Sequence, residues 1–286
     1  MYTSFYHLNG RPFQLSPDPR FYFGSRGHRK AMAYLTYGLN QGEGFIVITG
    51  DIGMGKTTLV GHLFSELDSQ KYVAAKVVTT QLAPDDTLRM VAAAFSIPFE
   101  GADKATLLRR IETFCSQCSR QGRRVLLVID EAQNLPMGSI EELRMLSNFQ
   151  TDEKALLQCF LLGQPQFRAT IASDGLEQLR QRIIASYHLE PMDAGETRAY
   201  VEHRLKTVGW QNDPSFSDET FRLIHTHTGG IPRRINTLCS RLLLFGFLEE
   251  LHAIDAAVVQ EVVSDLLREG MQTEKTERGV GIGAAA

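Results

Sequence analysis

Short apolar runs recur along the first two thirds of the chain, and segments with helical spacing separate them. The runs have the length of buried strands: GFIVITG (44–50), YVAAKVVTT (72–80), RVLLVID (124–130), LLQCFLLG (156–163) and SYHLEPM (186–192). Helices are expected between or before them, at 27–39, 56–67, 87–95, 107–120 and 140–149. Continuous apolar strands that alternate with helices are typical of a parallel sheet covered on both faces. We therefore predict an α/β domain over residues 44–192.

After residue 192 the strand-like runs stop, and the pattern is helical through residue 268. Asp218 and Asp255 stand where helix N-caps are expected, and Gly229-Gly230 stands where a helix should end. This pattern predicts a small helical domain at 193–268. Residues 269–286 are polar and then small, which is typical of a disordered tail.

The N-terminal region differs from both domains. Residues 1–25 are rich in proline, glycine and aromatic side chains, as in RPFQLSPDPRFYFGS. This composition is typical of an irregular segment that packs against a folded domain. We expect residues 1–43 to pack on the α/β core.

Composition and charge narrow the function classes. The formal net charge is −3, so we do not expect nucleic acid to be the partner. The four cysteines are scattered, as in a reduced cytosolic protein, and the pair Cys115 and Cys118 lies in a predicted helix without a second pair. No signal peptide opens the sequence, and no apolar run reaches the roughly 20 residues that a membrane span needs. We therefore expect a cytoplasmic protein, with any membrane association peripheral.

The stretch GDIGMGKTT directly follows the first apolar run and fits the pattern G-x-x-x-x-G-K-[ST]. Its glycines let successive backbone N–H groups point at a phosphate, and the following helix adds its positive N-terminal end. Lys56 can reach the β- and γ-phosphates, and the Thr57 hydroxyl can bind Mg²⁺. The candidate nucleotide-binding residues are Gly50, Asp51, Ile52, Gly53, Met54, Gly55, Lys56, Thr57 and Thr58. ATP and Mg²⁺ are the expected cofactors.

A second motif, RVLLVIDEAQ, ends an apolar strand in Asp130 and Glu131. Ligands of open parallel sheets bind at the carboxyl ends of the strands. Asp130 can hold Mg²⁺ through a water molecule, and Glu131 can polarise the water that attacks the γ-phosphate. A small-molecule kinase gains nothing from such a glutamate, whereas an ATPase requires one. The pair therefore predicts ATP hydrolysis, with Glu131 and Lys56 as catalytic residues.

Further candidate residues follow these motifs. Gln164 ends the next apolar strand, where its amide would lie between the carboxylates and the γ-phosphate and could report that phosphate's presence. Arg180 and Arg182 precede the last strand, at an edge from which an arginine can reach a neighbouring subunit's nucleotide. Arg233 and Arg234 begin a helix of the helical domain, from which an arginine can touch the γ-phosphate in one closure state only.

In this order, the motifs resemble those of the AAA+ ATPases. The segments PFQLSPDPRFYFGSRGHRKAMAYLTYGLNQGEGFIVITGDIGMGKTTL, DEAQNLP, LLGQPQF, LRQRI and GGIPRRIN resemble more narrowly the general secretion pathway protein A family of bacterial ATPases. Within that family they are most similar to the branch encoded with exosortase (PEP-CTERM) and exopolysaccharide export genes. The resemblance spans about residues 1–265.

The resemblance implies a P-loop NTPase sheet of the AAA+ type followed by a helical lid. It implies that Arg182 is a catalytic finger acting between subunits and that Arg233 is the nucleotide-binding sensor of the lid, with Arg180 and Arg234 as the alternatives. The segment FGSRGHRK would line the adenine side of the site. The resemblance also implies ring-shaped homo-oligomers, envelope secretion or polysaccharide-export proteins as partners, and peripheral association with the inner membrane. Longer members continue into a membrane span and a peptidoglycan-binding domain, which we do not expect here.

Three functions use these residues. The first is Mg²⁺-dependent ATP hydrolysis by an oligomer that drives assembly or remodelling of a bacterial envelope secretion or exopolysaccharide export system. The second is a DNA-handling ATPase, such as a transposition helper or an initiator relative; the net charge of −3 and the lack of an appended winged helix argue against it. The third is a slow ATP-dependent switch or scaffold. The sequence does not separate it from the first, because both need the same residues.

Overall fold

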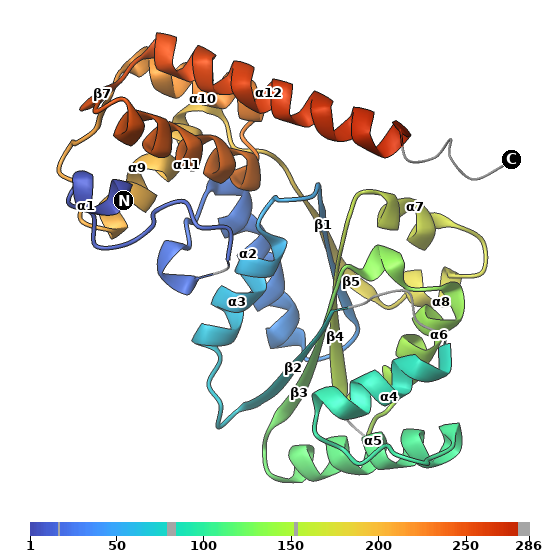
Figure 1. Ribbon diagram of the computed structural model, residues 1–286. Coiled ribbons are helices and arrows are strands. Elements are labelled where there is room, and N and C mark those ends of the chain that lie inside the picture. Colours follow the sequence, from blue (N-terminus) through green and yellow to red (C-terminus); the bar gives the residue numbers. More distant parts are fainter. Residues whose placement is uncertain (17, 79–83, 152–153, 280–286) are drawn as a thin grey trace, which may run out of the picture. The chain divides into compact units, whose positions relative to one another are not determined.

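A computed structural model of the protein describes residues 1–16, 18–78, 84–151 and 154–279 (Figure 1). The chain forms two compact units. The first, here called the α/β unit, is Arg26–Glu190. The second, here called the helical unit, combines Met1–Ser25 with the residues from Pro191 onward.

The α/β unit is built on a five-stranded sheet in the order β2-β3-β4-β1-β5, with every neighbouring pair parallel. Its strands are β1 (Phe45–Gly50), β2 (Tyr72–Val78), β3 (Arg124–Asp130), β4 (Leu157–Gly163) and β5 (Ile183–Leu189). Its helices are α2 (Arg26–Gln41), α3 (Lys56–Glu66), α4 (Pro84–Ala94), α5 (Lys104–Arg120), the 3₁₀ helix η2 (Ala132–Asn134), α6 (Met137–Leu146), α7 (Gln166–Ala172) and α8 (Glu177–Arg180). The predicted parallel α/β sheet is confirmed.

Element boundaries differ from the expected ones in a few places. Strand β5 begins at Ile183 rather than at 186, because its first residues pair with β1 at the protected start of that strand. The expected second strand extends to residues 79–80, which lie outside the described residues. The short helices α7 and α8 were not predicted, since neither is long enough to show a helical apolar period.

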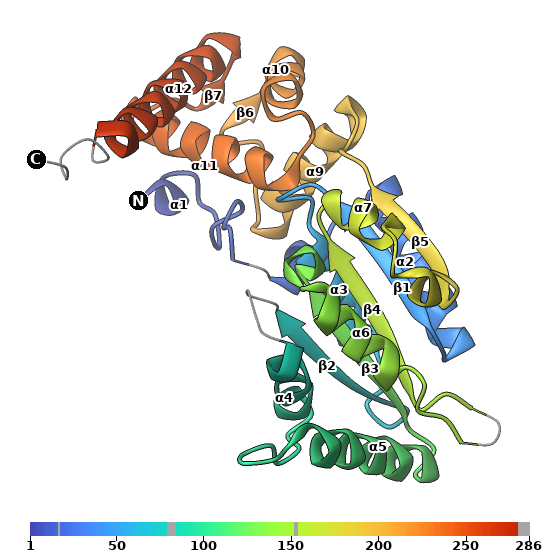
Figure 2. The same cartoon turned by 90° about the vertical axis from the view of Figure 1, so that its right-hand side faces the viewer.

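The two faces of the sheet carry different helices. Helices α2 and α3 lie on one face, and α4 to α8 lie on the other (Figures 1 and 2). The central strands β1 and β4 are buried along their whole length, which explains why their sequences are apolar except at Thr49 and Gln158. Helix α2 approaches β1 closely at Gly38, where an added Cβ would lie 2.4 Å from the Ile46 side chain.

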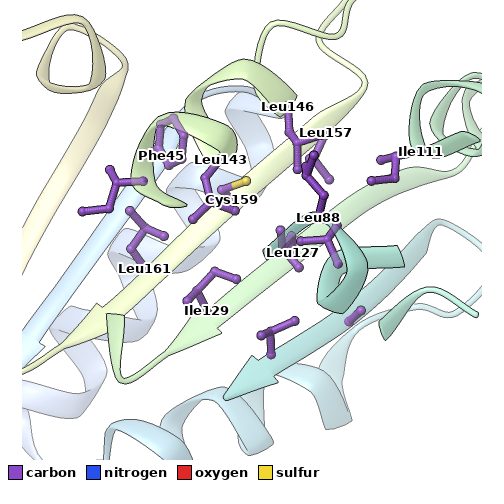
Figure 3. Close-up of a cluster of buried hydrophobic side chains, with 14 of the residues drawn as sticks. Phe45, Leu88, Ile111, Leu127, Ile129, Leu143, Leu146, Leu157, Cys159 and Leu161 are labelled. Carbon is purple, nitrogen blue, oxygen red and sulfur yellow. The ribbon is translucent and has the colours of Figure 1, made fainter. Parts of the chain in front are cut away.

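The main core lies between the sheet and helices α4 to α8 (Figure 3). Leu127, Cys159 and Leu161 of the strands belong to this core together with Leu143 of α6 and Ile111 of α5, and each of these side chains is fully buried. Cys115 and Cys118 line the same core from α5. Burial raises the pKa of the Cys115 thiol to about 12, so it is a neutral core side chain.

The helical unit contains α1 (Tyr2–Phe5), the 3₁₀ helix η1 (Pro19–Phe21), α9 (Ala194–Thr207), β6 (Ser215–Phe216), α10 (Asp218–Thr228), α11 (Pro232–Leu248), β7 (Ala253–Ile254) and α12 (Ala256–Gly279). Strands β6 and β7 form a small parallel pair, although no strand was expected beyond residue 192. The N-cap of α10 is Ser217 rather than Asp218, because the Ser217 hydroxyl accepts the Thr220 N–H. Asp255 caps α12 as expected, and Gly229 ends α10 in a left-handed conformation.

The N-terminal segment packs within the helical unit. Tyr6, Phe13 and Phe21 are buried in its core with side chains of α9 to α12, and the Tyr6 hydroxyl donates to Leu251 O at 2.9 Å. This differs from the expected packing of residues 1–43 on the α/β core. The aromatic side chains gain stability by burial, and the apolar side chains of these helices bury them. Of residues 1–43, only those from Arg26 onward, which include helix α2, belong to the α/β unit.

The C-terminal residues also differ from expectation. Helix α12 continues to Gly279, whereas residues 269–286 were expected to be disordered. The glutamate, lysine, glutamine and arginine residues of this segment are good helix formers, so a polar composition there is compatible with a helix. Residues 280–286 lie outside the described residues. Within the described part of the chain, no helix has both the length and the apolar character that crossing a membrane requires.

Candidate functional site

The glycine-rich loop connects β1, which ends at Gly50, to α3, which begins at Lys56. Gly53 and Gly55 have φ angles of 83° and 86°, in the left-handed region that favours glycine. A Cβ on Gly55 would also lie 2.9 Å from Nε2 of His28. The loop therefore requires glycine there, and it ends at a helix N-terminus, where backbone N–H groups favour an anion.

Helix α2 contacts this loop through His28. The side chain of His28 is buried, and its Nε2 lies 3.1 Å from the carbonyl oxygen of Met54. Met54 is itself buried inside the loop. The segment FGSRGHRK was expected on the adenine side of the site; the structure brings its histidine against the loop backbone.

Lys56 lies at the start of α3 and is only 6% exposed. Its Nζ donates to the carbonyl oxygens of Gly50, at 2.7 Å, and Asp51, at 3.0 Å. Burial lowers the pKa of Lys56, and the carboxylates of Glu131, Asp130 and Asp51 oppose that effect. The ammonium group is thus held inside the loop by neutral acceptors that an anionic phosphate could replace.

Thr57, in the first turn of α3, contacts Asp130, the last residue of β3. The Thr57 hydroxyl donates to Oδ2 of Asp130 at 2.8 Å, and Asp130 is 2% exposed. Lys76 of β2 also reaches this oxygen, with Nζ 2.8 Å away. One carboxylate oxygen therefore receives both a hydroxyl proton and an ammonium group.

These ligand types fit Mg²⁺. A hydroxyl and a carboxylate are oxygen donors, which this cation prefers. Among the described residues, no three side chains of His, Cys, Asp or Glu gather in a way that could hold a metal. Thr57 could bind Mg²⁺ directly and Asp130 through water, which is typical of Mg²⁺ sites where water and substrate phosphates complete the shell.

Glu131 and Gln164 also lie side by side. Gln164 Nε2 is 3.5 Å from Oε2 of Glu131, although the two residues follow different strands, β3 and β4. Gln133 of η2 donates to the same Oε2 at 2.7 Å, and its Oε1 accepts the backbone N–H of Gln164 at 2.9 Å. The Glu131 carboxylate is therefore surrounded by amide donors.

The candidate finger arginines contact their own unit. Arg182 donates from Nη1 to the carbonyl oxygen of Ser147, at 3.0 Å, and to its hydroxyl, at 3.3 Å. Arg180 donates to the carbonyl oxygens of Ile171 and Ser173, and Glu177 lies 3.7 Å away. The candidate lid arginines, Arg233 and Arg234, are exposed near the start of α11 in the helical unit.

The structure thus brings together five of the predicted side chains of the α/β unit, whereas Arg180 and Arg182 contact other residues. Lys56, Thr57, Asp130, Glu131 and Gln164 converge at the carboxyl edge of the sheet, whereas Asp51 and Ile52 of the loop are exposed. Gly50, Gly53, Met54 and Thr58 are buried or half-buried in the same loop and helix start.

Two polar residues at this edge, Lys76 and Gln133, were missed by sequence reasoning, and His28 was expected there only as part of the segment FGSRGHRK. Lys76 did carry a signal, because it is the one charged residue in the apolar run YVAAKVV. His28 and Gln133 stand in polar segments, where nothing in their spacing separates them from solvated side chains.

Comparisons with known proteins find similar sequences and structures. Residues 39–171 match the family model of an AAA domain. Over 274 residues, the chain is 37% identical to "General secretion pathway protein A" of Aeromonas hydrophila. That match covers 94% of this chain and 50% of the relative, so the chain spans about half the length of the curated relative it matches.

Solved structures resemble the fold. The Aeropyrum pernix ORC2 protein, solved in ADPNP-ADP complexes, matches with a TM-score of 0.68 and 17% identity over 90% of this chain and 71% of that chain. The Thermotoga maritima RuvB Holliday junction branch migration motor matches with a TM-score of 0.56 and 18% identity over 84% of this chain and 68% of that chain. Identities this low establish the fold alone.

Three findings lead to one conclusion. They are the match to an AAA domain, the parallel sheet with its helical C-terminal region, and the relative that is similar along most of the chain. The chain has the fold of an AAA+ P-loop NTPase, residues 39–171 are similar to an AAA domain, and the chain is similar to general secretion pathway protein A along 94% of its length.

Proposed function

We propose that the protein hydrolyses ATP to ADP and phosphate in a Mg²⁺-dependent reaction. The observation that carries this proposal is the convergence of Lys56, Thr57, Asp130 and Glu131 at one edge of the sheet. A loop that only binds nucleotide needs the first three of these groups. Glu131 adds the group that hydrolysis requires, since a carboxylate beside the γ-phosphate can orient and polarise water.

Each residue takes one role. Lys56 exchanges its contacts with Gly50 and Asp51 for the β- and γ-phosphates, while the loop and the N-terminus of α3 bind the phosphate chain. Thr57, and Asp130 through water, would hold Mg²⁺, which when bound neutralises charge on the phosphate oxygens. Glu131 aligns the attacking water, and Gln164 senses the γ-phosphate.

The active form is proposed to be a ring-shaped homo-oligomer in which Arg182 acts on the neighbouring subunit's nucleotide. Its partners in the isolated chain are the carbonyl and hydroxyl of Ser147, which are neutral groups that a phosphate can outcompete. Arg180 is held by two carbonyls and lies near Glu177, so Arg182 is the better candidate. Arg233 of α11 is proposed as the lid's sensor of the bound nucleotide.

The biological role proposed is the assembly or remodelling of an envelope secretion or exopolysaccharide export system, with the protein peripheral to the inner membrane. The similarity to general secretion pathway protein A supports the secretion role. The resemblance to the exosortase-associated branch supports the export role.

Phosphate release from ATP tests the reaction, with wild type, Lys56→Ala and Glu131→Gln measured in parallel. We expect Lys56→Ala to lose nucleotide binding and turnover together. Glu131→Gln should keep nucleotide binding and lose turnover, about a hundredfold or more. Lys71→Ala is the matched control, because Lys71 is exposed and pairs only with Asp68 among the contacts described for it. Turnover by Lys56→Ala at the wild-type rate would contradict the proposal.

The same assay separates the alternatives. A DNA-handling ATPase would be stimulated by duplex DNA, and the stimulation would fall steeply as salt rises. The net charge of −3 argues against nucleic acid as a partner, so we expect no such stimulation. A slow switch would show a low rate that does not rise with protein concentration.

A further inference from the structure

The backbone at Glu131 has an unusual conformation. Glu131 adopts φ 57° and ψ 39°, a left-handed geometry that is uncommon for a residue with a side chain. The tight 3₁₀ helix η2 follows directly. This turn returns the side chain of Gln133 to the carboxylate two residues earlier, where Nε2 donates to Oε2 at 2.7 Å.

The other end of the same amide contacts a different strand. Gln133 Oε1 accepts the backbone N–H of Gln164, the residue that follows β4. A carboxylate only accepts and a backbone N–H only donates, so these two partners determine the orientation of the amide. One side chain therefore connects the carboxylate after β3 to the backbone after β4.

The other two side-chain amides of the cluster, those of Gln164 and Gln166, contact Glu131 more weakly or only through another side chain. The 3.5 Å contact from Gln164 Nε2 to Oε2 is at the limit of a hydrogen bond, whereas the Gln133 contact is short. Gln166 Nε2 donates to Oε1 of Gln164 at 2.9 Å and so orients that side chain. Gln133 is thus the principal amide donor to Glu131 in this cluster.

We propose that Gln133 is a positioning residue for hydrolysis, which aims the Glu131 carboxylate and couples it to the strand end that carries Gln164. This rests on the proposed function, in which Glu131 aligns water and Gln164 senses the γ-phosphate. A displacement of the backbone at Gln164 would move the Gln133 amide that is bonded to it, and this amide would in turn move the Glu131 carboxylate. Removal of phosphate would thereby turn Glu131 away from its working orientation.

Two substitutions separate this role from a structural one. Gln133→Met removes both hydrogen bonds at nearly constant volume. Gln133→Glu keeps an oxygen acceptor for the Gln164 N–H but replaces the donor to Glu131 with a like charge. If Gln133 aims Glu131, both variants lose about ten- to a hundredfold in kcat while KM for ATP and the affinity for ADP stay unchanged. If Gln133 only holds the Gln164 backbone, Gln133→Glu retains wild-type kcat, and the proposal is overturned.

The matched control is Gln117→Met, which makes the same chemical change on the exposed face of α5. We expect it to change neither kcat nor KM. A loss of activity in this control equal to that of Gln133→Met would also overturn the proposal, because the loss would then reflect the substitution rather than the site.

A second measurement does not depend on turnover. Gln133→Glu should lower Tm by about 2–4 °C, because two carboxylates then face each other. The double variant Glu131→Gln with Gln133→Glu exchanges donor and acceptor, so it should recover most of that loss. Absence of recovery would show that the two side chains are not coupled and would overturn the proposal.

The outcomes for the two proposals are distinct. Wild-type protein that hydrolyses ATP together with a fully active Gln133→Glu variant overturns only the role of Gln133. Wild-type protein that binds nucleotide without hydrolysis overturns the proposed function and the role of Gln133 with it.

Discussion

The ammonium group of Lys76 lies 2.8 Å from Oδ2 of Asp130, the carboxylate oxygen that also accepts the Thr57 hydroxyl. Lys76 comes from the edge strand β2, and Asp130 is the last residue of β3, which neighbours it. Asp130 is almost fully buried, so an opposite charge nearby offsets the cost of removing the carboxylate from water. The same oxygen belongs to the residue proposed to hold Mg²⁺.

Lys76→Met should therefore change the response to Mg²⁺. Without the ammonium group, Mg²⁺ no longer competes with a cation for Asp130, so the Mg²⁺ concentration that gives half-maximal nucleotide binding should fall by about three- to tenfold. In EDTA the same variant should lose about 1.5–3 kcal/mol of unfolding free energy, because a buried carboxylate loses a charged hydrogen bond. Fluorescent ADP binding and urea unfolding measure the two effects. Lys71→Met, which lies just before the same strand, is the control, and an unchanged Mg²⁺ dependence would contradict this assignment.

Arg182→Ala should abolish most ATP hydrolysis without weakening nucleotide binding. A finger in trans is worth about 10³–10⁵ in kcat, and it acts only in assembled protein. Wild-type specific activity should therefore rise with protein concentration. Mixing Arg182→Ala with Glu131→Gln should restore turnover, because some interfaces then combine an intact Arg182 with an intact Glu131. Arg180→Ala is the comparison variant, and loss of turnover there with an active Arg182→Ala would transfer the role to Arg180.

Arg204→Met should destabilise the helical unit. The Arg204 guanidinium is buried, donates to the carbonyl oxygens of Pro12 and Gln14 and to the Tyr200 hydroxyl, and stacks on Phe21. The variant leaves these acceptors without their donor, so unfolding free energy should fall by at least about 2 kcal/mol. Urea unfolding measures this, and proteolysis should cut the N-terminal segment faster. Arg222→Met on the exposed face of α10 is the control and should stay within about 0.5 kcal/mol of wild type.

Stability should fall as the solution is acidified through the ordinary histidine range, in part because of His203. Burial lowers the pKa of His203 below its unfolded value near 6.5, and its Nε2 has no hydrogen-bond partner in the described part of the chain. The unfolded chain therefore binds a proton that the folded chain does not, so protonation favours unfolding as pH falls below about 6.5. Urea unfolding between pH 8 and 5.5 should show a smaller loss for His203→Gln than for wild type. The exposed His227→Gln serves as control, and parallel curves for all three proteins would exclude His203.

The sheet could be predicted because its strands carry their own signal. Strands buried on both faces are mostly apolar, so β1, β3 and β4 appear as apolar runs within a residue of their observed bounds. The phosphate loop could also be predicted from the sequence, because Gly53 and Gly55 adopt backbone angles that favour glycine. The carboxyl ends of parallel strands share one edge, which is why Asp130 and Gln164 could be expected near the loop.

Tertiary structure alone decided the placement of the N-terminal segment and the partners of polar side chains. Tyr6 and Phe21 are buried among apolar side chains of the helical unit, and no local sequence pattern indicates which unit would bury them. Lys76, Gln133 and His28 contact groups that lie 54, 31 and 26 residues away, and hydrogen bonds over such separations follow from the packing of strands and helices rather than from neighbouring residues. The sequence thus determined the sheet and the nucleotide loop, whose requirements are local, while the network around Asp130 and Glu131 arose only when the strands were aligned.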